Sequence, residues 1–271
     1  LLEIEGKKIL VDCGLTQGTK LADDINWDSF PYNPKEIDIL FITHAHVDHL
    51  GRVPKLIHEG FRGKIYSTKP TKSLALPMLE DTAEILGKNK DLDLDKIYSL
   101  ENIKLALSLW EGFDYHQTLK ILENLEVSFF NAGHILGSAM FLFVYNGKKI
   151  LFTGDLGNSP SPLLPDIDKM TDVDYLVMES VYGDRNHESR DDRRKFLEEA
   201  IEDNYKRHGT LIIPTFSLER AQELLFELNA LVGEKRIPIM PIFFDSPLAI
   251  RLTEVFKQYK NYFNERAQQA M

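Results

Sequence analysis

The sequence contains one cysteine in 271 residues and no run of about 18 apolar residues that could cross a membrane. A single cysteine excludes an internal disulfide and fits a reducing compartment, so we predict a cytoplasmic protein with no membrane segment. Positive charge is also scarce, with 32 lysines and arginines against 42 aspartates and glutamates and a formal net charge of −10. This charge argues against nonspecific binding to nucleic acid, although bound divalent metals can make a local site positive.

The two ends of the chain lack the signals that usually mark a start and a stop. The sequence has no initiator methionine and begins inside a predicted hairpin of residues 1–5 and 8–12. It ends in a helical pattern without a stop signal, so we expect a segment of a longer protein. With 43% hydrophobic residues, its 271 residues suffice for a substantial core in one large domain or two smaller ones.

What the sequence does contain is a dense histidine motif, His44-Ala45-His46-Val47-Asp48-His49. An apolar run over residues 37–42 predicts a buried strand just before it, so the motif falls on a turn at a strand end. Imidazole and carboxylate groups at this spacing can converge on two adjacent cations, and zinc prefers such ligands. The alternative is a polar loop rich in histidine by chance, but the whole chain has only 8 histidines. The motif therefore predicts a metal site.

Five apolar runs of the chain each end at a carboxylate or an imidazole. These terminal groups are Asp12, His44, His134, Asp155 and Glu179. One run belongs to a predicted hairpin, 140–145 with 148–153, whose Asn146-Gly147 turn is the strongest short hairpin signal. If the strands share sheets, the five groups gather along one rim, where bound metals would compensate their charge.

The pattern of predicted secondary structure changes near residue 181. Helical patterns are predicted beyond this point over residues 189–207 and 218–232 and from 247 onward. Between them, apolar strand-like runs occupy residues 210–214 and 237–244. This alternation is typical of βαβ units and implies a parallel sheet flanked by helices. We therefore predict two domains, over residues 1–182 and 183–271.

Together these motifs resemble the metallo-β-lactamase superfamily. The HxHxDH pattern of residues 44–49 is followed in the expected order by His134, within Ala-Gly-His-Ile-Leu-Gly-Ser-Ala, and by Asp155, within Thr-Gly-Asp. Three later segments are similar to the β-CASP branch of this superfamily: residues 179–187, 213–224 and 245–249. That branch includes the endonuclease subunit of the cleavage and polyadenylation specificity factor and related prokaryotic ribonucleases.

The resemblance implies an α/β fold, the αβ/βα sandwich of two sheets flanked by helices, with a partial β-CASP α/β domain. Carried over by position, His44, His46 and His134 would hold one zinc ion, and Asp48 and His49 would hold another. Asp155 would bridge the two ions, and Asp12 would orient the histidine motif. Imidazole–carboxylate sites can also hold iron or manganese. Zinc is therefore expected here because of the superfamily and not from the ligand types alone.

The activity that the resemblance implies is an RNA-processing ribonuclease, endonucleolytic, exonucleolytic or both. Two divalent ions suit this reaction, because a metal-bound hydroxide can attack phosphorus while the metals stabilise the transition state. Asp48 and Asp155 would take part as metal-bound catalytic residues, and Glu179 would support a general acid further along the family's chain. His187 and Arg220 are possible substrate contacts, against the alternatives of a surface histidine and an ion-paired arginine. RNA is the expected partner, and a homodimer is possible.

The sequence departs from the family pattern in one respect. The family completes its site with two histidines that follow the β-CASP insertion, the last zinc ligand and the general acid. No histidine follows His208, so we expect the second zinc site to be incomplete in this chain. Two other functions stay open: a hydrolase of the superfamily that acts on DNA, a thioester or a lactam, and a non-catalytic partner in RNA processing.

Overall fold

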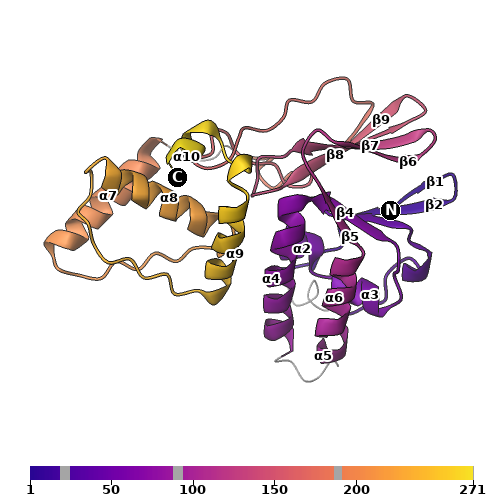
Figure 1. The fold of residues 1–271 in the computed structure, drawn as a ribbon, viewed down its shortest axis with the longest axis horizontal. Helices are drawn as coiled ribbons and strands as arrows, with labels where there is room; N and C mark the ends of the chain where they lie inside the picture. The colour runs from indigo at the N-terminus through magenta and orange to yellow at the C-terminus, as the bar shows by residue number, and fades with distance from the viewer. Residues whose placement is uncertain (19–24, 88–93, 186–190, 271) are drawn as a thin grey trace. The chain divides into compact units, whose positions relative to one another are not determined.

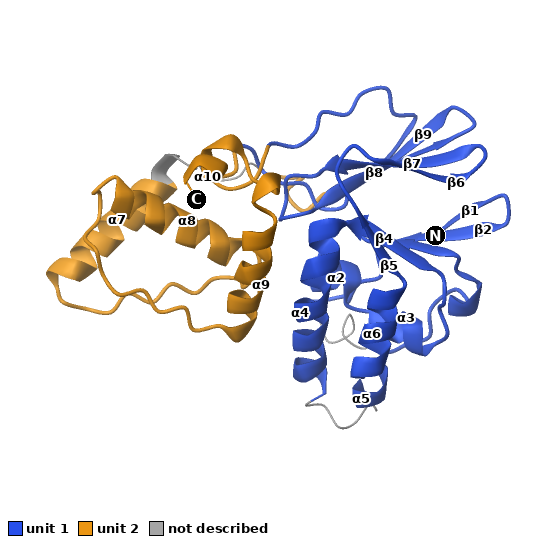
Figure 2. Ribbon diagram, in the orientation of Figure 1, with its two compact units in different colours: residues 1–159, 166–178 blue, residues 160–165, 179–271 orange. Residues whose placement is uncertain are grey.

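The computed structural model describes residues 1–18, 25–87, 94–185 and 191–270. The chain divides into two compact units, and Figure 2 shows them in different colours. Unit 1 comprises residues 1–159 and 166–178, and unit 2 comprises residues 160–165 and 179–271. The domain boundary that the sequence predicted, after residue 182, remains a prediction. Within the described residues, no helix combines the length and the apolar character needed to cross a membrane.

The first sheet of unit 1 brings Asp12 and the histidine motif to one edge. Its five strands, in spatial order, are β1 (Leu2–Ile4), β2 (Lys7–Val11), β3 (Ile39–Phe41), β4 (Lys64–Thr68) and β5 (Trp110–Phe113). The hairpin of β1 and β2 is antiparallel, as predicted, whereas β2, β3, β4 and β5 are parallel. The carboxyl ends of parallel strands share one edge of a sheet, so the residues after β2 and β3 emerge together.

The second sheet does the same for His134 and Asp155. Its strands are β10 (Tyr175–Val177), β9 (Lys148–Phe152), β8 (Ala139–Tyr145), β7 (Leu125–Asn131) and β6 (Thr118–Leu122). The predicted hairpin is confirmed: β8 and β9 are antiparallel, and Asn146 and Gly147 have φ values of 47° and 77°. Since β8 is antiparallel to both of its neighbours, β7 and β9 run in one direction and end at the same edge.

The two sheets pack face to face around an aromatic core. Buried residues of both sheets form this core: Ile9, Ile39 and Phe41 from the first, and Leu125, Val127, Phe129, Phe141 and Phe143 from the second. The Phe41 ring centroid lies 5.2 Å from that of Phe141 and 6.2 Å from that of Phe129. Burying each such side chain contributes roughly 1.5–3 kcal/mol, so this core fixes one sheet against the other.

Helices and an irregular segment cover the outer faces of the sandwich. The helices α3 (Val53–His58), α4 (Lys69–Leu86) and α6 (Leu100–Ser108) lie on the first sheet, with the short α5 (Leu94–Ile97) beside them (Figure 1). On the second sheet, Leu156, Ile167 and Met170 pack against Met140 and Leu151. The sandwich of two sheets that the sequence implied is confirmed, and the described helices of unit 1 lie on its first sheet.

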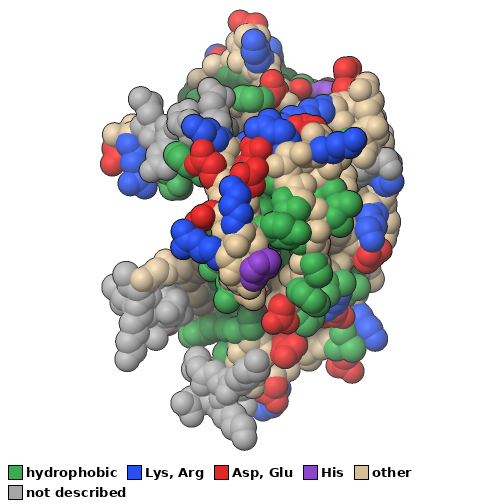
Figure 3. All heavy atoms as spheres, turned by 90° about the vertical axis from the view of Figure 1, so that its left-hand side faces the viewer, with side chains coloured by type: hydrophobic (Ala, Val, Ile, Leu, Met, Phe, Trp, Pro, Cys, Tyr) green, Lys and Arg blue, Asp and Glu red, His purple; other side chains and the backbone are tan. Residues whose placement is uncertain are grey.

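Unit 2 is helical in the part that the structure describes. It contains α7 (Asp191–Lys206), α8 (Arg220–Gly233), α9 (Pro247–Gln258), the 3₁₀ turn η2 (Lys260–Tyr262) and α10 (Glu265–Ala270). Ile201, Leu228, Leu231 and Ile237 form its buried cluster. The side chain of Ser246 caps α9 by accepting a hydrogen bond from the Ala249 amide. On the face drawn in Figure 3, acidic and basic side chains are interspersed with apolar ones.

The two strands predicted in unit 2 are wrong. Residues 210–214 and 237–244 have no strand assignment, and within the described part of unit 2 neither pairs with another strand. Ile212 is 81% exposed and Phe243 is 89% exposed, so their apolar side chains are not buried as a parallel sheet requires. An apolar run indicates that a segment tends to be buried, but the segment forms a strand only when a neighbouring strand completes its backbone hydrogen bonds.

Candidate metal centre

The histidine motif occupies a tight turn after β3. His44 is fully buried, His46 has an extended backbone with φ −69° and ψ 151°, and the one-turn helix α2 (Val47–Leu50) follows. The segment after β2 holds this turn, because the Cys13 amide donates to the His49 carbonyl at 2.7 Å. Gly14 makes that approach possible: a Cβ at this position would lie 1.5 Å from the Asp48 carbonyl oxygen. Only glycine fits there without displacing the turn.

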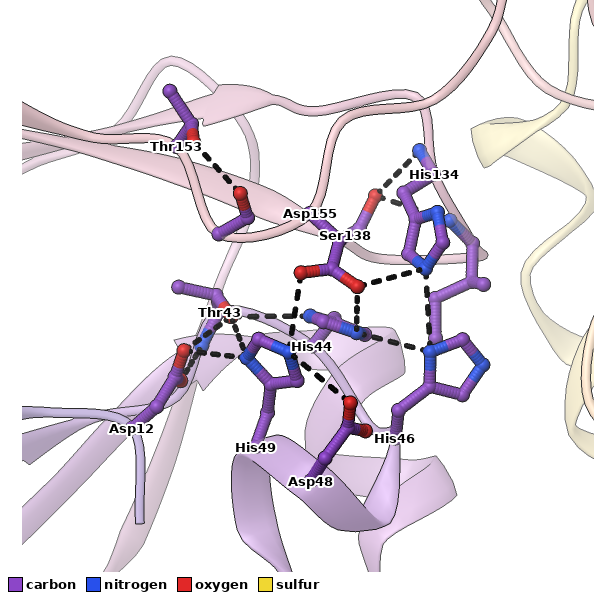
Figure 4. Close-up of polar contacts among 12 residues, drawn as sticks. Asp12, Thr43, His44, His46, Asp48, His49, His134, Ser138, Thr153 and Asp155 are labelled. Carbon is purple, nitrogen blue, oxygen red and sulfur yellow. Dashed lines mark hydrogen bonds and ion pairs between the residues drawn. The ribbon is translucent and has the colours of Figure 1, made fainter. Parts of the chain in front are cut away.

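Three imidazoles and one carboxylate converge from both sheets (Figure 4). Nδ1 of His46 lies 3.0 Å from Nε2 of His44 and 3.2 Å from Nε2 of His134. Oδ2 of Asp155 lies 3.8 Å from Nε2 of His44 and 3.6 Å from Nε2 of His134. Tetrahedral ligands at zinc–nitrogen distances of about 2.0–2.1 Å are roughly 3.3 Å apart. These four donor atoms therefore fit a single zinc ion.

A second group of ligands shares Asp155 with the first. Its members are Asp48, His49 and Asp155. Nε2 of His49 lies 3.2 Å from Oδ1 of Asp155 and 3.9 Å from Oδ2 of Asp48. The two oxygens of Asp155 thus face different groups, which is the arrangement of a carboxylate able to bridge two ions. The Asp48 side chain is about half exposed, so this side of the centre is open to solvent.

Asp12 and Thr43 hold the imidazoles in place. Oδ2 of Asp12 accepts hydrogen bonds from Nδ1 of His49 at 2.7 Å and from the Thr43 hydroxyl at 2.8 Å, while Oδ1 accepts from the Thr43 amide at 2.7 Å. The Thr43 oxygen also lies 3.1 Å from Nδ1 of His44. Because the hydroxyl donates to Asp12, it accepts from this nitrogen, and Nε2 of His44 keeps its lone pair for a metal. Asp12 adopts a φ of 61°, which aspartate tolerates better than most residues.

The histidines of the two ligand groups differ in protonation, because burial dominates the pKa of some and neighbouring carboxylates dominate the pKa of another. Burial lowers the pKa of His44 well below its usual value and also lowers the pKa of His46, so both rings are neutral, as ligands must be. Burial acts on His49 in the same direction, but hydrogen bonds and charges from Asp12 and Asp155 together outweigh it and raise its pKa to about 10. For Asp155, the hydrogen bond and charge of His49 outweigh burial and lower its pKa. The second group therefore holds a proton that a metal has to displace.

Two supporting residues were not singled out by the sequence analysis. One is Thr43, described above. The other is Ser138, which is buried and whose Oγ accepts hydrogen bonds from the His134 amide at 3.0 Å and the Ile135 amide at 3.2 Å. Ser138 lies inside a motif that carries the family resemblance and Thr43 directly precedes one, and short hydroxyl side chains in turns commonly bond to nearby backbone groups. The sequence could therefore have pointed to these two residues, but it could not show which atoms their hydroxyl groups contact.

Among the described residues, Glu179 and Arg220 belong neither to the two ligand groups nor to the residues shown to support them. Glu179 is the first residue of the main segment of unit 2 and is half-buried, so its role beside the metal centre remains a prediction. Arg220 begins α8, is mostly exposed and forms an ion pair with Glu223 at 2.8 Å, as in the alternative raised for it. His187 lies outside the described residues.

Comparison with protein families agrees with this fold. A family model for the metallo-β-lactamase superfamily domain matches residues 1–173, and one for the Beta-Casp domain matches residues 221–270. The chain therefore belongs to the β-CASP branch of the metallo-β-lactamase superfamily. Both matches confirm the resemblance read from the motifs.

Several curated proteins are similar to the chain over nearly its whole length. A ribonuclease of Thermus thermophilus is 37% identical over 99% of this chain and 59% of its own length. Subunit 3 of the cleavage and polyadenylation specificity factor of Dictyostelium discoideum is 33% identical over 98% of this chain and 34% of its own length. An RNase J-like protein of Methanocaldococcus jannaschii is 34% identical over 98% and 59%, respectively. The chain thus spans about three fifths of these relatives or less.

Proposed function

We propose that this chain carries the metal centre of a zinc-dependent ribonuclease that hydrolyses phosphodiester bonds in RNA. The observation that supports this most strongly is the sharing of Asp155 between two ligand groups, His44, His46 and His134 on one side and Asp48 and His49 on the other. The names of its relatives supply the substrate class, since they include a ribonuclease and endoribonucleases.

Zinc at this centre would supply Lewis-acid activation of water and neutralise negative charge that develops on the phosphoryl oxygens. The residues of this chain do the rest. His44, His46 and His134 would hold one ion, with Asp155 presenting its second oxygen toward the ion held by Asp48 and His49. Asp12 fixes the ring of His49 and takes the hydrogen bond of its Nδ1, so that only Nε2 faces the site.

Proton transfer to the leaving oxygen would require a general acid in addition to the two ligand groups. Glu179 is proposed to support such a group, and His187 and Arg220 are proposed to contact the phosphate backbone. The predicted homodimer and cytoplasmic location belong to the same proposal. Sedimentation of the intact protein and cell fractionation would test these two points.

Assays of the intact protein on RNA, single-stranded DNA and a thioester test the proposal. We expect zinc-dependent cleavage of RNA, abolished by a chelator and restored by zinc. His46→Ala removes a ligand of the first ion and should lower the rate at least about 100-fold. His58→Ala is the matched control, because His58 is an exposed histidine at the end of α3, outside both ligand groups.

Each alternative function predicts a different outcome. Preferential cleavage of DNA or of the thioester would replace the ribonuclease with another hydrolase of the superfamily. Binding of RNA without cleavage, in protein loaded with zinc, would indicate a non-catalytic partner. Cleavage of RNA by His46→Ala at the parental rate would exclude the metal mechanism. Labelling the RNA at one end or internally distinguishes endonucleolytic from exonucleolytic cleavage.

A further inference from the structure

A network of hydrogen bonds surrounds the start of the loop that carries His134, and none of its members is a proposed metal ligand. Asn131, the last residue of β7, is only 5% exposed. Its Oδ1 accepts a hydrogen bond from the Gly133 amide at 2.9 Å, and its Nδ2 donates to the Asp166 carbonyl at 2.9 Å. One buried side chain thus ties the chain directly before His134 to a segment more than 30 residues away.

Asp168 binds the backbone groups of the same residue, Asn131. Its Oδ2 accepts from the Asn131 amide at 2.7 Å, and its own amide donates to the Asn131 carbonyl at 3.0 Å. The same Oδ2 lies 2.9 Å from Nε2 of His116. The end of β7 is therefore bonded to residues 166–168 through both its backbone groups and its side chain.

The position of His134 depends on these bonds as well as on the hydrogen bond from its amide to Ser138, because Gly133, the residue directly before it, has no side chain to hold it. Gly133 has a φ of 64° and no side chain that packing could lock. On its other side, a Cβ on Gly157 would lie 1.7 Å from the Gly133 carbonyl oxygen, so the backbones of these two residues approach closely. Metal ligands have to be held within about 0.5 Å of their productive positions, and hydrogen bonds to supporting residues usually do this.

We propose that Asn131 and Asp168 are positioning residues for His134, and that affinity for the ion held by His44, His46 and His134 depends on them. This proposal rests on the metal centre proposed above. The competing explanation is that Asp168 merely secures the end of a strand. That explanation predicts a loss of stability and no specific effect on metal binding.

The chain offers a matched control in Asp174. Its Oδ2 accepts from the Lys149 amide at 2.9 Å and its amide donates to the Lys149 carbonyl at 3.0 Å, on β9 of the same sheet. The side chains of Asp168 and Asp174 are similarly exposed, at 28% and 32%. Asp174→Ala therefore removes the same kind of strand contact without touching the His134 loop.

The experiment measures zinc affinity by competition with a chromophoric chelator, together with the visible spectrum of the cobalt-loaded protein and thermal unfolding, all in the intact protein. We expect Asn131→Ala and Asp168→Ala to bind zinc roughly 10–100-fold more weakly and to alter the cobalt spectrum. Asp174→Ala should lose comparable stability with unchanged zinc affinity. Asp168→Asn retains an oxygen acceptor for the Asn131 amide and should bind zinc nearly as the parent does.

Parental zinc affinity in Asn131→Ala, or equal losses in Asp168→Ala and Asp174→Ala, would overturn the proposal. If Asn131→Ala does not fold, the comparison of Asp168→Ala with Asp168→Asn decides, and equal affinity in the two variants contradicts a positioning role. His46→Ala separates this from failure of the metal centre. If that variant binds as much zinc as the parent, the centre itself is wrong and the positioning role falls with it. If it loses zinc while Asn131→Ala does not, only the positioning role is wrong.

Discussion

Nδ1 of His49 lies 2.7 Å from Oδ2 of Asp12, and this contact determines which nitrogen of the ring faces the metal centre. A carboxylate can only accept, so Nδ1 donates and Nε2 points toward Asp155, 3.2 Å away. Asp12 comes from the end of β2 and His49 from the turn after β3. The contact therefore joins two neighbouring strands of the first sheet at the edge where the ligands gather.

Replacing Asp12 by alanine should weaken zinc binding roughly 10–100-fold, because His49 and Thr43 both lose the group that orients them. Chelator competition measures the change. Asp38→Ala is the control: Asp38 also bonds to a backbone amide of the first sheet, that of Lys8 at 2.9 Å, but it lies at the other end of β3. An equal loss of zinc affinity in that variant would contradict the specific role of Asp12.

The pH dependence of the metal-free protein follows from opposite pKa shifts. His44 and His46 have pKa values below 6.5, so the unfolded chain binds more protons and the free energy of unfolding falls as the pH drops below 6.5. His49, with a pKa of about 10, contributes stability that is complete below pH 6.5 and is lost as the pH rises toward 10. After treatment with a chelator, we expect maximum thermal stability near pH 6.5.

Thermal unfolding between pH 5 and 9, with and without zinc, measures this dependence. Asp12→Asn removes one of the two charges that raise the pKa of His49 and should partly flatten the alkaline side of the metal-free curve. Zinc would take the place of the His49 proton, so the zinc-loaded protein should not lose stability there. A melting temperature of the metal-free parent that keeps rising from pH 6.5 to 9 would show that His49 is not protonated.

Gly14→Ala should destabilise the protein by about 2–4 kcal/mol and reduce its zinc content, because the added Cβ would overlap the Asp48 carbonyl. Gly147→Ala is the contrasting variant. Gly147 has a φ of 77° with nothing within 4 Å of an added Cβ, so only backbone strain of about 1–2 kcal/mol is expected. Chemical denaturation and metal analysis would compare the two. Normal zinc content in Gly14→Ala would mean that the turn can move without harm.

Asn264 should be important for the stability of unit 2. Its Nδ2 donates to the carbonyls of Ser161 at 3.1 Å and Leu164 at 3.2 Å, and its Oδ1 accepts from the Ala267 amide at 2.8 Å at the start of α10. Asn264→Ala should cost about 1–3 kcal/mol and speed hydrogen exchange of residues 161–164. Asn264→Asp keeps the acceptor for Ala267 and should recover only part of this loss. Full recovery would mean that the donor contacts contribute nothing.

Local patterns predicted much of unit 1. The Asn146-Gly147 turn identified its hairpin, and the apolar run before His44 identified β3, because both signals come from neighbouring residues. The strand β5 gave no such signal: it has four residues, one of them Gly112, and exists through its pairing with β4. In unit 2 the sequence instead predicted strands that its described residues do not form, since residues 210–214 have strand-like composition without a partner strand.

The sequence by itself determined the chemistry of the centre: three imidazoles and a carboxylate in six residues, and later His134 and Asp155, are ligand types for zinc. Only the tertiary structure decided which atoms meet. His46 and His134 are 88 positions apart, and no periodicity records that their ring nitrogens lie 3.2 Å from each other. That distance depends on how the phenylalanine core sets one sheet against the other, and on backbone contacts such as Asp168 with Asn131. Such contacts join segments remote in sequence, so they arise from packing of the whole unit and not from any local pattern.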